Sequence, residues 1–299
     1  MKKFLRFLKN ESGVTAVFVG LLMVFFLGVT AIVIDVGRLY LEKSKLQKAV
    51  DAAVLGGGQV LVNNQSQAKT IAKDLALNNT YTITDSDITV TSNYIKVTNE
   101  VSVPMTFAKV IGINNVNVSA SAKVIVGPLK KGTGITPIAI EKSAIPDGKQ
   151  LKCDNPNKGN CGYLDLGGNG ASGLEDAIKN GTSVAINDTA KTKTGQSWGP
   201  VEDAFQYLID SDADKPICQS AATADRSCKR VIFCPVIDTW DGVNGKDTVK
   251  IIGLAAYWIE GINKSDKEVK GQFIKMVGPG EIGDIGIGDY NLYGVKLVE

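Results

Sequence analysis

The most pronounced hydrophobic pattern lies near the start of the chain, where residues 14–34 carry no charge over 21 positions. Fourteen of these are Leu, Ile, Val or Phe, and they fall on every face of a helix. Such a helix spans about 32 Å, close to the hydrocarbon thickness of a bilayer. The pattern predicts an uncleaved signal anchor, a transmembrane helix over 13–36. A core helix is rarely apolar all round, and a cleaved signal has a shorter apolar run.

The helical pattern continues beyond the span, but with one apolar face. A stem helix is therefore expected over 37–58, ending at Gly56, Gly57 and Gly58. Its apolar stripe has to pack against the rest of the protein or a partner. The spacing of Asp35 and Arg38 predicts a weak ion pair beside it. The stripe consists of Leu39, Leu46, Val50, Ala53 and Val54.

Shorter periodic segments predict a small α+β unit over 59–127. Residues 65–78 have the spacing of a short amphipathic helix. Residues 95–103 and 116–126 alternate between apolar and polar side chains, which predicts two strands with one or two helical turns between them. A linker is expected at 130–134.

The remainder, 128–299, is expected to be a mixed α/β, strand-rich domain. Residues 251–259 are apolar on both faces, which predicts a central strand too short to span a membrane. The fold class is therefore α+β: one transmembrane helix continuing into an amphipathic stem, a small α+β unit and the C-terminal domain. Further elements are expected at 172–180 (helix), 201–209 (helix), 230–237, 248–259, 269–277 and 291–298 (strands).

Composition narrows the possible functions. The 299 residues are 44% hydrophobic and 21% charged, so the part outside the membrane should fold. The chain has no histidine, which excludes Ser-His-Asp and Cys-His catalysis and most zinc enzymes. A net charge of +2 favours no nucleic-acid partner. The basic tail, 1–12, is expected in the cytoplasm. The numbers of basic residues on the two sides of the span are equal, so charge does not decide the orientation. The cysteines favour an exported location for the residues after the span.

The five cysteines all lie in the C-terminal half. Cys153 with Cys161 and Cys218 with Cys228 are natural local pairs for an exported domain, although connectivity cannot be derived from sequence. Cys234 lies in a strand-like run and is expected to be a buried free thiol. A zinc site is the alternative, but it lacks both a C-x-x-C spacing and a histidine.

Other constellations predict ordinary structure, so no catalytic residue, metal ligand or cofactor is expected. Residues 278–283 match G-x-G-x-x-G, but Pro279 and the glycines that follow favour a turn. Residues 154–160 are rich in oxygen-bearing side chains without the spacing of a calcium loop. Ala16 and Gly20 form a small-xxx-small pair through which a second helix, including one from another copy, could pack. The paired carboxylates Glu202 with Asp203 and Asp210 with Asp212 are expected on helix surfaces or ends.

Several segments together resemble the TadE/TadG-like proteins of Flp (tight-adherence) pilus assembly. The resemblance covers roughly 11–126, and residues 162–168 are similar to a segment of longer Gram-positive members. It implies a bitopic envelope protein that assists pilus assembly, secretion or surface attachment, with no chemistry of its own. The segments are 11–17, 34–40, 46–55, 101–112 and 116–126.

Two departures from the family limit what the resemblance implies. Gly13 stands where type IV prepilins are cut, but the fifth position after it is Phe18 instead of Glu, which argues against assembly as a pilin subunit. The Asp-x-Ser-x-Ser motif of a von Willebrand A domain is also missing. Pilus-assembly or secretion proteins are therefore the expected partners. The alternatives are a membrane-tethered binding module for cell wall or a surface polymer, and a membrane-tethered hydrolase that uses carboxylates.

Overall fold

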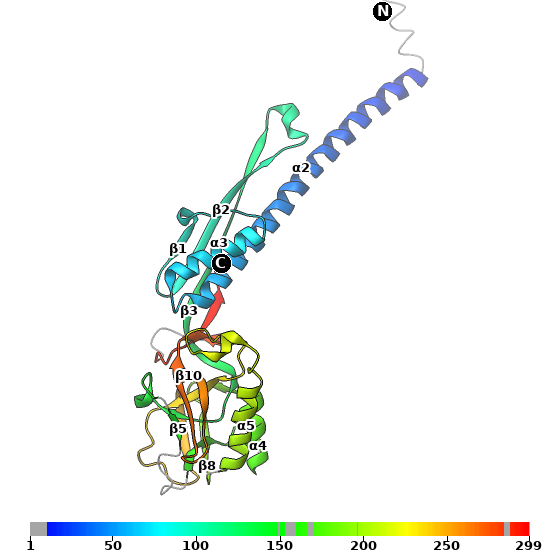
Figure 1. Cartoon of the computed structure of the whole chain (residues 1–299). Helices are drawn as coiled ribbons and strands as arrows, with labels where there is room; N and C mark the ends of the chain where they lie inside the picture. Colours follow the sequence, from blue (N-terminus) through cyan, green and yellow to red (C-terminus); the bar gives the residue numbers. More distant parts are fainter. Residues whose placement is uncertain are drawn as a thin grey trace, which may run out of the picture.

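The protein has the predicted α+β fold: a long N-terminal helix, then small helices and a strand-rich sheet (Figure 1). Residues 1–10, which make up most of the expected basic tail, lie outside the described part of the chain. The computed structural model describes residues 11–148, 150–152, 160–166, 170–195, 197–283 and 288–298. Within these ranges, the side chains of residues 11–14, 150, 152, 160 and 161 are not described.

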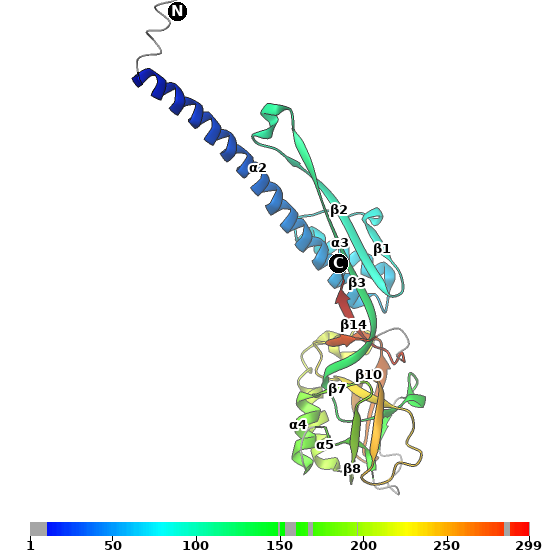
Figure 2. The same cartoon turned by 180° about the vertical axis from the view of Figure 1, so that it is seen from behind.

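Helix α2 (Glu11–Val60) contains the predicted span and stem as one uninterrupted helix of 50 residues. Its N-terminal part projects away from the rest of the protein (Figures 1 and 2). The most apolar 18-residue window has a mean hydropathy of 2.9, and none of it is buried. The C-terminal part instead buries one stripe, in which Leu46, Val50 and Ala53 are 0% exposed. This contrast supports single-pass membrane anchoring.

A proximal unit packs on the stem part of α2. The meander β1–β2–β3 is antiparallel, and β14 pairs with β3 along part of its length. Asn64 caps the following helix because its side chain accepts hydrogen bonds from the amides of Ser66 and Gln67. The elements are α3 (Gln65–Asn78), η1 (Asp85–Asp87), β1 (Ile88–Val90), β2 (Tyr94–Pro104), η2 (Ala108–Ile111), β3 (Asn115–Ile135) and β14 (Leu292–Leu297).

The three glycines expected to end the stem lie inside the helix, which continues to Val60. Their role is close packing. A Cβ on Gly57 would lie 2.6 Å from Cδ1 of Ile95 and 2.9 Å from the carbonyl oxygen of Ala68. A Cβ on Gly58 would likewise press against Val124. Tertiary contact with α3 and the sheet thus offsets the low helix propensity of glycine.

Strand β3 corrects a second expectation, because the predicted linker at 130–134 is part of it. The strand runs for 21 residues from the proximal unit into the distal body. It pairs with β2 at its start and with β7 at its end. A continuous strand joins the two parts where a flexible linker was expected. The division of the chain at 127/128 into separate domains stays a prediction.

The distal body contains the remaining elements. Helices α4 and α5 each begin slightly earlier than the sequence pattern predicted. The elements are β4 (Ile140–Glu141), η3 (Lys142–Ala144), β5 (Gln150–Lys152), β6 (Asn160–Leu164), α4 (Gly170–Asn180), β7 (Thr182–Ala185), β8 (Thr189–Thr194), α5 (Trp198–Asp210), η5 (Pro216–Gln219), β9 (Val231–Ile237), β10 (Thr248–Asn263), β11 (Glu268–Ile274), β12 (Met276–Val277) and β13 (Gly280–Ile282).

Strand β10 is the central strand that its two-sided apolar pattern predicted. It pairs with β9 on one side and β11 on the other, and both of its faces are buried. Tyr257 and Ile259 lie in the cluster that includes Phe205 of α5, whereas Leu254 and Trp258 lie in the cluster on the other face. The distal core thus has two layers of apolar side chains about one sheet.

Gly57→Ala tests the packing role of the glycines. By propensity alone, alanine should stabilise a helix by about 1 kcal/mol over glycine. Here we expect Gly57→Ala to lower the free energy of unfolding by roughly 1–3 kcal/mol, because the new Cβ meets a backbone oxygen. Thermal unfolding of the full chain in detergent, followed by circular dichroism, measures the change. Gly37→Ala is the matched control, since a Cβ there has nothing within 4 Å. A G57A protein as stable as G37A would contradict the packing role.

Candidate functional site at the membrane-proximal end

The exposed part of α2 is an apolar surface on all sides. From Val17 to Val36 its large apolar side chains are between 40% and 69% exposed. Contact between this apolar surface and water would be unfavourable at every turn of the helix, whereas the hydrocarbon of a bilayer would cover it. Near the end of this surface lies Asp35, the first charged residue after the uncharged run.

Asp35 joins α2 to the tip of the β2–β3 hairpin. The residue is only 5% exposed. Oδ1 accepts a hydrogen bond from the amide of Thr106 at 2.8 Å, and Oδ2 accepts from the amides of Phe107 at 3.0 Å and Ala108 at 2.7 Å. Arg38 adds a bond from Nη1 to Oγ1 of Thr106 at 3.3 Å. Asp35 thus binds the hairpin tip, and the ion pair with Arg38 that its spacing predicted is replaced by these hydrogen bonds.

This arrangement satisfies donors that a short helical turn leaves open. The three amides lie at the start of η2, where backbone N–H groups have no partner within the turn. A carboxylate is the strongest acceptor a side chain can offer them. These hydrogen bonds therefore hold the hairpin tip beside Asp35, where the apolar segment of α2 ends.

Further polar contacts hold the stem along the sheet. Nε2 of Gln47 donates to the carbonyl oxygen of Ser121 at 2.9 Å. The hydroxyl of Tyr81 donates to Oε1 of Glu42 at 2.9 Å. Burial, together with Glu42, raises the pKa of Tyr81 to about 12, so its proton stays in this bond at neutral pH. The stem is thus bound by both apolar and polar contacts.

The small-residue pair in the span faces open space. Ala16 and Gly20 are both exposed, and a Cβ added to Gly20 would meet nothing within 4 Å. The surface needed for close approach of another helix is present. A helix partner, including a second copy of this chain, stays a prediction.

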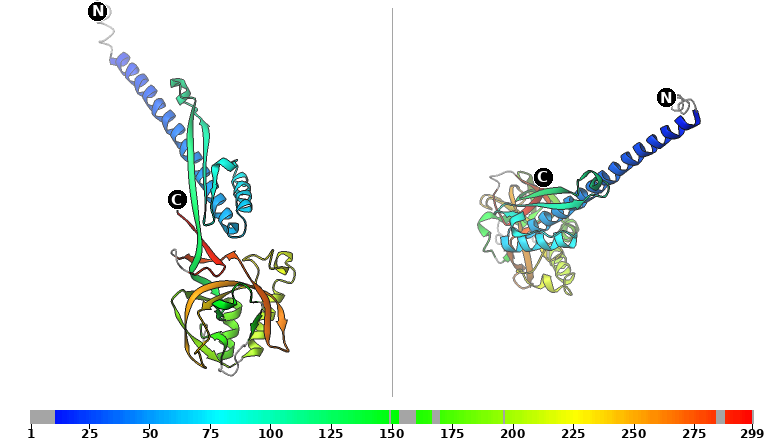
Figure 3. Two further views of the ribbon diagram at one scale, coloured as in Figure 1. Left: turned by 90° about the vertical axis from the view of Figure 1, so that its left-hand side faces the viewer. Right: turned by 90° about the horizontal axis from the view of Figure 1, so that it is seen from above.

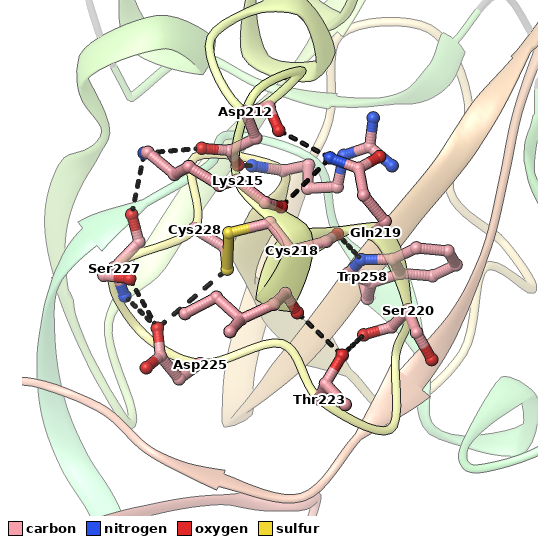
Figure 4. Close-up of a disulfide and its surroundings, with 12 residues drawn as sticks. Asp212, Lys215, Cys218, Gln219, Ser220, Thr223, Asp225, Ser227, Cys228 and Trp258 are labelled. Atoms are coloured by element: carbon pink, nitrogen blue, oxygen red, sulfur yellow. Dashed lines mark hydrogen bonds and ion pairs between the residues drawn. A yellow bond between two sulfur atoms is a disulfide. The ribbon is translucent and has the colours of Figure 1, made fainter.

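The distal body contains a disulfide between Cys218 and Cys228, the local pair expected from the sequence (Figure 4). Both residues are buried, and the carbonyl of Cys218 accepts a hydrogen bond from Nε1 of Trp258 at 2.9 Å. Cys234 is buried with a free thiol, as expected. The other expected pair cannot be placed, because Cys153 and the side chain of Cys161 lie outside the described residues.

The ligand atoms of Asp212, Cys218 and Cys228 lie within 4.8 Å of one another, but the group does not fit a metal ion. Metals bind thiolates, and here the two sulfurs are bonded to each other. The carboxylate of Asp212 accepts a hydrogen bond from Nζ of Lys215 at 2.7 Å (Figure 4). It also accepts one from the amide of Arg230 at 2.8 Å. Asp212 was expected at a solvated helix end. It is buried because these two donors stabilise its charge there.

The other predicted carboxylates are more accessible. Asp203 and Asp210 are exposed, while Glu202 is partly buried and forms an ion pair with Lys264 at 2.7 Å. The glycine-rich match at 278–283 lies on β13 and the turn before it, where Gly280 has a φ of +154°. A Cβ at Gly280 would collide with the carbonyl of Lys131, so glycine is required for packing. Residues 154–159 lie outside the described part of the chain.

Comparison with known proteins identifies the membrane-proximal part. Residues 13–60 match the model of a family described as putative Flp pilus-assembly TadE/G-like. The TadE/G-like resemblance is confirmed for this segment. Its limits nearly coincide with helix α2, so the TadE/G-like segment corresponds to the span and the stem together. Neither a curated protein nor a solved structure matches the chain significantly.

The sequence did not reveal the main contact of this site. Asp35 was visible in the sequence as the charge directly after the uncharged run, but its partners lie about 70 positions further along the chain. Only the helical turns expected between the strands at 95–103 and 116–126 pointed to free amides that would need an acceptor. The spacing of apolar and polar residues predicts helices and strands, but it does not predict which distant turn a carboxylate will cap.

Asp35→Ala should release the hairpin tip without unfolding the stem. Hydrogen bonds to a charged group contribute about 1.5–3 kcal/mol, so the amides of Thr106, Phe107 and Ala108 should exchange with solvent roughly tenfold faster or more. Hydrogen exchange of the full chain in lipid nanodiscs measures this. Asp74→Ala, at an exposed position on α3, is the control and should leave these rates unchanged. Equal protection in D35A and the wild type would show that Asp35 does not hold the tip.

Proposed function

We propose that this chain is a non-enzymatic, membrane-anchored component of Flp-type pilus assembly, with its N-terminus in the cytoplasm and its bulk outside the membrane. It would present the proximal unit at the outer membrane surface, where pilus-assembly or secretion proteins dock. The observation that carries the proposal is the coincidence of the TadE/G-like match with helix α2.

Helix α2 supports an assembly role because it connects the bilayer to the folded body without a hinge. The span is exposed on all sides, and one apolar stripe of the stem is buried in the proximal core. Tyr40 is 74% exposed and Leu41 is 59% exposed, so an apolar surface remains open just beyond the span. Such a surface, next to a membrane, suits contact with another membrane-bound protein.

The disulfide supports the proposed orientation. Disulfides persist in oxidising compartments and are rare in the cytoplasm. The bond between Cys218 and Cys228 lies in the distal body, on the C-terminal side of the span. If that body is outside the cytoplasm, the basic N-terminal tail is inside.

A structural role is also favoured by the state of the reactive groups. Asp212 and Glu202 each pair with a lysine, which leaves neither carboxylate free as a general acid or base. Burial raises the pKa of the Cys234 thiol far above its usual range, so it stays protonated and is a poor nucleophile. These features favour assembly over the carboxylate hydrolase considered from the sequence.

Thiol mapping tests the orientation. Alkylating intact cells during lysis, before reduction, should leave Cys218 and Cys228 linked, as seen by mass spectrometry without reductant. Cys234 is the internal control: it should be alkylated, and only after denaturation. The double variant C218S/C228S should lose about 3 kcal/mol of stability, because the bond closes a ten-residue separation. Recovering both residues as alkylated thiols before reduction would place the body in the cytoplasm.

Site-specific photo-crosslinking tests the function. A photoreactive residue at Tyr40 should capture a pilus-assembly or secretion protein in membranes. The control is the same residue at Tyr207, which is 51% exposed but lies on α5 in the distal body. Deleting the gene should also reduce surface pili, and the wild-type copy should restore them. If pilus formation, adhesion and secretion are all unchanged by the deletion, the proposal is wrong.

A further inference from the structure

The tip of the β2–β3 hairpin carries the most exposed apolar side chains that the structure describes. Val110 is 89% exposed and Ile111 is 77% exposed, more than any large apolar residue of the span. Phe107 and Ile113 beside them are 42% and 45% exposed. Between Pro104 and Asn117 the only charge is Lys109. Isolated apolar residues on a surface need no explanation, but a contiguous group on one turn does.

The tip is an ordered turn. Met105 is 2% exposed at its base, and its amide donates to the carbonyl of Asn114 at 2.9 Å. The amide of Ile113 donates to the carbonyl of Ala108 at 3.1 Å. Gly112 takes a left-handed conformation with a φ of +88°. The apolar side chains are therefore presented by a defined backbone.

The hydrogen bonds from Asp35 fix where this turn lies. They tie residues 106–108 to Asp35, the first charged position after the uncharged run, so the tip lies beside the end of the apolar segment of α2. The hairpin runs beside α2 with its tip directed toward the N-terminal end of the helix (Figures 1 and 3). Tyr40 lies just beyond Asp35 and is 74% exposed, as expected for an aromatic side chain at a membrane surface.

We infer that the hairpin tip, residues 107–113, inserts into the surface of the bilayer that α2 spans, giving the chain a second, peripheral membrane contact. The apolar side chains of Phe107, Val110, Ile111 and Ile113 enter the acyl boundary. Lys109 extends its ammonium group to the lipid phosphates while its methylene stem stays in the apolar layer. The inference rests on the membrane anchoring in the proposed function and deepens it.

Lipid is the occupant that the geometry favours. The tip is bound to α2 at the membrane boundary, so a bilayer is within reach whenever α2 spans it, whatever other protein is present. Four side chains on one turn are also far less than the surface of roughly 1,000 Å² that a specific protein interface needs. A second contact of this kind would restrict rotation and tilt of the helix relative to the membrane.

Tryptophan quenching by brominated lipids tests the inference with the full chain in vesicles. Ile111→Trp adds a fluorophore at the tip. Leu77→Trp is the matched control, at an exposed apolar position on α3 that is 61% exposed. Phe25→Trp reports on the span, and the unmodified chain gives the background of the three native tryptophans. We expect F25W and I111W to lose most of their added fluorescence and L77W to keep it. Adding Val110→Asp to I111W should restore its signal.

Each other result has a distinct meaning. If F25W is quenched and I111W is quenched no more than L77W, the tip stays out of the lipid and the inference fails while the anchor stands. An I111W emission that shifts to the blue without quenching would show burial against protein, such as a second copy, and would also overturn it. If F25W is not quenched, the anchor is wrong and the inference fails with it.

Discussion

The continuity of helix α2 between lipid and protein is the constraint on which the rest of the structure depends. One half of the helix is apolar on all sides and needs a bilayer, while the other half buries a single stripe under α3 and the sheet. Because both halves share one backbone hydrogen-bond ladder, motion of the span is transmitted to the body. The glycines at the C-terminal end of α2 allow that body to pack directly against helix backbone.

The bond network of Asp35 adds a second link at the membrane boundary. It connects the helix to the far end of the β2–β3 hairpin, and β3 then runs on into the distal body. Helix α2 therefore joins the membrane boundary to the proximal core, and strand β3 continues from the hairpin into the distal body. A chain built in this way suits the scaffold role proposed above.

What the sequence could predict was local. The periodicity of residues 65–78 and the two-sided apolar run of β10 identified a helix and a central strand, because burial imposes a repeat on neighbouring positions. Prediction from the local pattern failed where a contact with a distant part of the chain determined the structure. Gly57 was expected to end a helix and instead allows close packing, and Asp212 was expected in solvent and is buried between Lys215 and Arg230. Neither partner can be identified from local pattern alone.

The most direct test of this account is the distance between two points on α2, one in the span and one in the stem. Nitroxide labels at the exposed positions Val24 and Lys48, in the full chain in nanodiscs, should be about 36 Å apart along the axis, the rise of 24 helical residues. Pulsed electron resonance should give one narrow distribution near that value. A broad or shorter distribution would mean that the helix breaks near Gly37, and span and stem would then be separate elements.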